Sequence, residues 1–76
     1  MDTRSLNDSI IQFVRASVTW KQQLNAVDTP NYSKDVHYKA VHDAQKYRLR
    51  VLRHPMFDTK RELEFLNAVQ SYVETV

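Results

Sequence analysis

The chain contains no glycine among its 76 residues, and this feature restricts the available folds more than any other. Average usage of about 7% would supply roughly five glycines in a chain of this length. The tight turns of β-hairpins need positive φ angles that glycine adopts most easily, so the composition argues against a sheet protein. It also excludes the glycine-rich loops that hold phosphates and dinucleotides. We therefore expect helices joined by short loops that contain proline or asparagine.

Residues 33–54 give the clearest helical pattern. At about 100° per residue, one stripe of this segment carries only small or apolar residues and a tyrosine. Its members are Val36, Ala40, Ala44, Tyr47 and Val51. The two alanines indicate a neighbouring helix that approaches closely, and Pro55 predicts where the helix ends. Arg48 lies inside the apolar arc, where we expect a guanidinium that reaches out to water or an ion pair with a carboxylate of another helix.

Two further helices are predicted, over residues 5–26 and 59–75. Ser5 is the expected N-cap of the first, and its broad apolar arc indicates contact with two neighbouring helices or with a second copy of the chain. The last helix is predicted to start with a capping box of Thr59 and Glu62. The middle helix starts at Pro30 or at Ser33. The fold expected is all-α: a single domain, residues 1–76, forming a compact three-helix bundle with self-association left open.

The composition also limits the chemistry that we expect. The chain has no cysteine, which excludes disulfides and thiolate zinc sites and fits a cytoplasmic location. No run approaches the roughly 18 apolar residues of a membrane-spanning helix, and the N-terminus has no apolar signal-peptide region. His37 and His42 are spaced by five residues, which does not stack them as metal ligands on a helix. We expect no catalytic residues, cofactor, metal site, membrane association or small-molecule substrate.

Positive charge gathers in one part of the sequence although the net charge is only +2. Residues 34–61 carry eight Lys or Arg against three Asp, whereas residues 62–76 carry three Glu and no basic residue. A basic stripe is predicted on the outer face of the second helix, with an extension beyond it. Its members are Lys39, Lys46, Arg50 and Arg53, extended by Lys60 and Arg61. Such a stripe could bind nucleic-acid phosphates, but it is also what an ordinary solvated helix face looks like.

Four residues near the predicted loops are candidates for binding a protein partner. They are Tyr32, Tyr38, Met56 and Phe57, which are less obviously buried than the other large apolar residues. The alternative is that they seal the ends of a small core. No motif assigns the chain to a family. The leading prediction is a small non-catalytic interaction or regulatory protein, with a homodimer as one option. A nucleic-acid-binding protein that uses the basic stripe is the alternative.

Overall fold

The structure is a computed structural model that describes residues 4–76. This part of the chain forms three α-helices and one short 3-10 helix, with no strand. They are α1 (Arg4–Asn25), α2 (Lys34–Leu52), η1 (Thr59–Arg61) and α3 (Glu62–Thr75). The prediction of an all-α protein with three helices is confirmed, and each helix lies within a few residues of its expected bounds.

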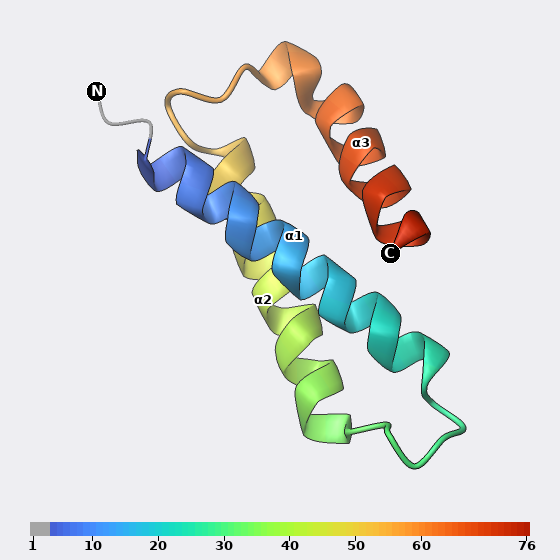
Figure 1. The fold of residues 1–76 in the computed structure, drawn as a ribbon. Coiled ribbons are helices and arrows are strands. Elements are labelled where there is room, and N and C mark those ends of the chain that lie inside the picture. Colours follow the sequence, from blue (N-terminus) through green and yellow to red (C-terminus); the bar gives the residue numbers. More distant parts are fainter. Residues whose placement is uncertain (1–3) are drawn as a thin grey trace.

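The helices α1 and α2 pack together as an antiparallel hairpin (Figure 1). Ala40 and Ala44 are only 4% and 3% exposed at their contact, which agrees with the close approach that small residues predict. Hydrogen bonds tie the two helices at both ends. The side-chain Oε1 of Gln23 accepts the backbone N–H of Ser33 at 2.8 Å, and the Oγ of Ser5 lies 2.7 Å from Nε2 of His54.

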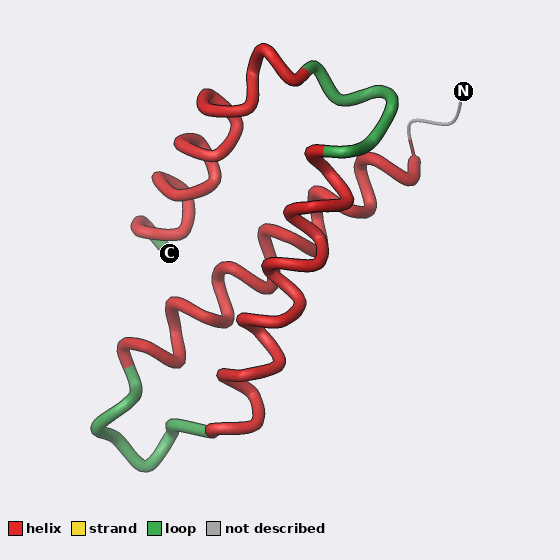
Figure 2. Tube along the Cα trace, turned by 180° about the vertical axis from the view of Figure 1, so that it is seen from behind, coloured by secondary structure: helices red, strands yellow, loops and turns green. Residues whose placement is uncertain are grey.

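The third helix rests on α1 and runs in roughly the same direction as α1 (Figure 1). Phe13 and Ala16 of α1, Ala44 of α2 and Val69 of α3 form the core cluster. The rings of Phe13 and Phe65 lie 6.0 Å apart, so α3 is anchored to α1 by an aromatic contact. Seen from behind, α3 lies beside the hairpin, joined to it by the loop after α2 (Figure 2). The helices α2 and α3 have almost no direct contact with each other.

The ends of α1 and α2 show one correct and one wrong capping prediction. Ser33 is the N-cap of α2, and its Oγ accepts the N–H of Val36 at 3.4 Å. The helix therefore starts at the later of the two predicted points. Ser5 is not an N-cap, because α1 already begins at Arg4. Its hydroxyl is bonded to His54 instead, so it holds the start of α1 against the segment that follows α2.

The capping box predicted from Thr59 and Glu62 is also wrong. Asp58 is the N-cap at this point, and its Oδ1 accepts the N–H of Lys60 at 3.0 Å. The chain then makes a 3-10 turn over Thr59–Arg61 before α3 begins at Glu62. An aspartate and a threonine are both good N-caps, and here the aspartate one residue earlier is used.

Candidate interaction groove

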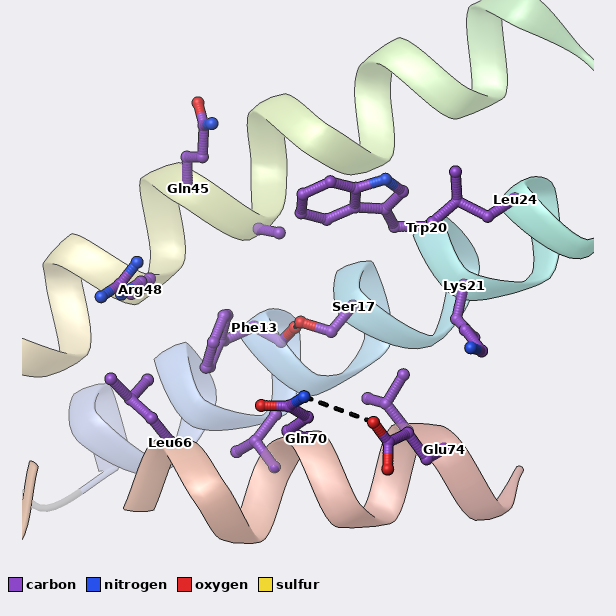
Figure 3. A pocket seen from close by; sticks show the side chains of 13 residues that line it. Phe13, Ser17, Trp20, Lys21, Leu24, Gln45, Arg48, Leu66, Gln70 and Glu74 are labelled. Atoms are coloured by element: carbon purple, nitrogen blue, oxygen red, sulfur yellow. Dashed lines mark hydrogen bonds between the residues drawn. The ribbon is translucent and has the colours of Figure 1, made fainter. Parts of the chain in front are cut away.

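A groove of about 610 Å³ lies between α2 and α3, with α1 as its floor. It exists because α2 and α3 both pack on α1 and hardly touch each other. The groove is lined by Phe13, Ser17, Trp20, Lys21 and Leu24 of α1, by Ala44, Gln45 and Arg48 of α2, and by Leu66, Val69, Gln70, Val73 and Glu74 of α3. Figure 3 draws these side chains on the three helices; Gln45 points away from α1 and α3.

The groove follows the helix axes. Its floor is formed at successive turns of α1, from Phe13 to Leu24, a distance of about 16 Å at 1.5 Å per residue. Phe13 is 7% exposed, whereas Leu24 is 50% exposed. On α3, the lining residues from Leu66 to Val73 also follow one another at helical spacing. The site is thus a long apolar channel, well packed at the Phe13 end and open to solvent near Leu24.

Polar side chains border this apolar channel. On the α3 side, Nε2 of Gln70 donates a hydrogen bond of 3.3 Å to Oε1 of Glu74 (Figure 3). On the α2 side, Arg48 is exposed, and the described residues contain no ion pair for it. The first of the two expectations for Arg48, a guanidinium that reaches out to water, therefore describes it, and the ion pair with another helix is not formed. Lys21 is half-buried at the floor and also has no ion pair within residues 4–76.

The residues predicted to bind a protein partner fall into two groups at opposite ends of α2. The rings of Tyr32 and Tyr38 each stand edge-on to the ring of His37, with centroid distances of 5.6 and 5.8 Å. Tyr38 is 61% exposed, and Nδ1 of His37 is buried with no hydrogen-bond partner among the described residues. Met56 and Phe57 follow the other end of α2, which is about 28 Å long. The four residues therefore do not form a single patch, and none of them lines the groove.

Met56 and Phe57 contribute to a smaller hollow of about 270 Å³ between the start of α1 and the start of α3. Phe57 is half-buried, and its ring stands edge-on to Phe65 at 5.4 Å. It therefore packs against Phe65, which itself packs on the core cluster. Met56 is 42% exposed beside it.

The residues of the basic stripe lie where the periodicity places them. Lys39, Lys46 and Arg50 are exposed on one side of α2, and Arg53, the exposed C-cap of this helix, follows them. Lys46 Nζ and Arg50 Cζ each lie 5.4 Å from the centroid of the Tyr47 ring, so both cations stand against the same aromatic side chain. Lys60 and Arg61 are exposed too, but they lie on η1 beyond the loop that follows α2.

Metal and membrane sites are not evident in residues 4–76. This part of the chain holds no group of three or more metal-ligating side chains that could bind an ion. His37 contacts the rings of two tyrosines, His42 is exposed and His54 is bonded to Ser5. None of the described helices is long and apolar enough to cross a membrane.

The groove was not identified from the sequence, although two signals for it are present. The apolar arc of the first helix is wide enough for two neighbours, and the part of it at Trp20 and Leu24 extends along the groove. Arg48 within an apolar arc marks a surface that is not closed by another helix. Comparisons with models of known protein families, with curated proteins and with solved structures give no match to this chain.

Proposed function

We propose that the protein is a non-catalytic interaction module that binds an amphipathic helix of a partner protein in the groove between α2 and α3. The observation that carries this proposal is the apolar channel of about 610 Å³ that follows the helix axes over several turns. An amphipathic helix laid with its apolar face into such a groove is a recurring mode of protein recognition. A helix in this position would contact α1, α2 and α3 together and complete a four-helix arrangement.

The exposed apolar residues of the groove supply the driving force for this binding. Covering a leucine side chain completely is worth about 1.5–3 kcal/mol, so covering the exposed half of Leu24 contributes roughly 1 kcal/mol. Trp20 is half-buried beside it, and tryptophan is among the residues that most often dominate binding energy at interfaces. Both line the groove toward its open end, so a bound helix would cover them.

The only tryptophan of the chain lies in the groove and provides the test. The probe is a helix-forming peptide of about 18 residues with leucines at helical spacing, glutamine on both flanks and no tryptophan. We expect a saturable shift of the Trp20 emission to shorter wavelength as the indole loses contact with water. A flat titration at millimolar peptide would contradict the proposal.

A pair of variants then locates the binding site. Leu24→Ala should weaken peptide binding about fivefold or more, because it truncates a side chain at the mouth of the groove. Ile11→Ala is the matched control, because Ile11 is 46% exposed on the same helix and does not line the groove. If Leu24→Ala has no effect while truncation of Tyr38 or Met56 removes binding, the interface lies at the residues predicted from the sequence and the groove is the wrong site.

Nucleic-acid binding by the basic stripe is the second candidate function. It is supported by the four exposed cations along α2 and its C-cap, two of which stand against Tyr47. Arg48 lies two residues from both Lys46 and Arg50, which places it about 160° away around the helix. The basic stripe and the groove therefore use different sides of α2. Fluorescence anisotropy of a labelled random-sequence duplex at low and near-physiological salt tests this function separately from the peptide titration.

A further inference from the structure

We infer that the helix bound in the groove carries acidic residues on the flank that faces α2. This inference rests on the proposed function, because it concerns the chemistry of the same occupant. The two walls of the groove differ in charge. The helix α2 contains five Lys or Arg and two Asp, a net charge of +3, whereas α3 contains three Glu and no basic residue, a net charge of −3.

The side chains that line the groove show the same difference. Arg48 on α2 is exposed and has no ion pair within residues 4–76. Glu74 on α3 already accepts a hydrogen bond from Gln70, and Lys21 adds a second cation at the floor. The lining thus contains two cations without a carboxylate partner and one anion that is hydrogen-bonded.

Binding of a helix would change the environment of Arg48. A partner that covers the apolar floor removes water from the guanidinium at its edge, and a charge that loses water is costly unless it is paired. A glutamate on the adjacent flank of the partner would pair with Arg48, whereas a lysine there would be repelled. A helix can enter the groove in either direction. A peptide with glutamates on one flank can therefore bind in the direction that places this flank next to Arg48 on α2.

Three peptides with the same leucine stripe test the inference. They carry glutamate, glutamine or lysine on one flank and glutamine on the other, and Trp20 fluorescence reports their binding. We expect the glutamate peptide to bind most tightly. The glutamine and lysine peptides should bind alike, because the lysine flank can turn away from Arg48 toward α3, where Glu74 is already hydrogen-bonded to Gln70. The dissociation constant of the glutamate peptide should be about tenfold lower than those of the other two at low salt, because partly exposed ion pairs are of modest strength. This difference should become smaller near physiological ionic strength.

Charge reversal in the protein is the decisive step. Arg48→Glu should make the lysine peptide bind most tightly and the glutamate peptide most weakly, and Arg48→Gln should remove the difference between the peptides. Arg15→Glu is the matched control, because it changes the net charge equally but is exposed on the side of α1 away from the groove. The preference for the glutamate peptide should persist in this variant. Far-UV circular dichroism and urea unfolding establish that each variant is folded.

The outcomes separate the inference from the proposed function. Equal affinity of all three peptides would overturn the inference and leave helix binding intact. Failure of every peptide to shift the emission would overturn the proposed function itself. If no peptide binds and the protein sediments as a dimer that Arg48→Glu dissociates, a second copy of the chain occupies the groove and the inference of an acidic partner helix is wrong.

Discussion

Replacement of Phe13 by alanine should remove a large part of the stability of this domain. Phe13 is 7% exposed and contacts Phe65 with a centroid distance of 6.0 Å, so it links α3 to the hairpin. A buried Phe→Ala change typically costs about 3–5 kcal/mol, from lost transfer free energy and the cavity left behind. Because Phe13 faces the groove on one side, its neighbours can relax into part of that cavity, and we expect about 3 kcal/mol.

This loss is large compared with the total stability of the chain. At roughly 0.05–0.15 kcal/mol per residue, a domain of this length has a free energy of unfolding of about 4–11 kcal/mol. Urea unfolding followed by far-UV circular dichroism measures the change, with Ile11→Ala as the control on the same helix. Ile11 is 46% exposed, so its truncation should cost less than about 1 kcal/mol. A cost for Phe13→Ala as small as that of the control would refute the packing of α3 on α1.

The remaining predictions concern the helix ends and the basic stripe. Ser33→Ala should lower the free energy of unfolding by about 0.5–1 kcal/mol, because it removes the N-cap of α2. Asp58→Ala should lower the free energy of unfolding by about 1 kcal/mol, and Thr59→Ala should lower it by less. If urea unfolding shows the larger loss for Thr59→Ala, Thr59 is the N-cap after all. If the protein binds duplex DNA, reversing both Lys46 and Arg50 should reduce the slope of log affinity against log salt by about 2, and an unchanged slope would place the phosphates elsewhere.

The features that the sequence predicts correctly are local ones. The apolar stripe of α2 follows from periodicity, and its alanines at positions 40 and 44 are indeed buried. The N-cap at Ser33 and the helix end before Pro55 depend on residues within a few positions of each other. The wrong capping prediction at Thr59 arose where two good N-caps, Asp58 and Thr59, are adjacent and local rules do not rank them.

The position of α3 could not be predicted from such rules. Its apolar face could pack against α1, against α2 or between them, and only the tertiary structure shows that it packs on α1. The groove is a consequence of that choice, so its lining could not be listed from the sequence. The separation of the candidates Tyr32 and Met56 is a different case, because the helix predicted over residues 33–54 already places them at its opposite ends.

Arg48 gives a physical reason why the groove stays open. If α3 moved toward α2, the guanidinium would be pressed against Leu66 and other apolar side chains of the lining, and an unpaired buried charge is strongly unfavourable. Arg48→Leu removes this obstacle. We expect it to raise the free energy of unfolding by about 1 kcal/mol as the leucine gains apolar contacts, and to weaken peptide binding as the walls approach. Urea unfolding and Trp20 titration of this variant measure the two effects, and a gain in stability with undiminished peptide affinity would show that Arg48 does not hold the groove open.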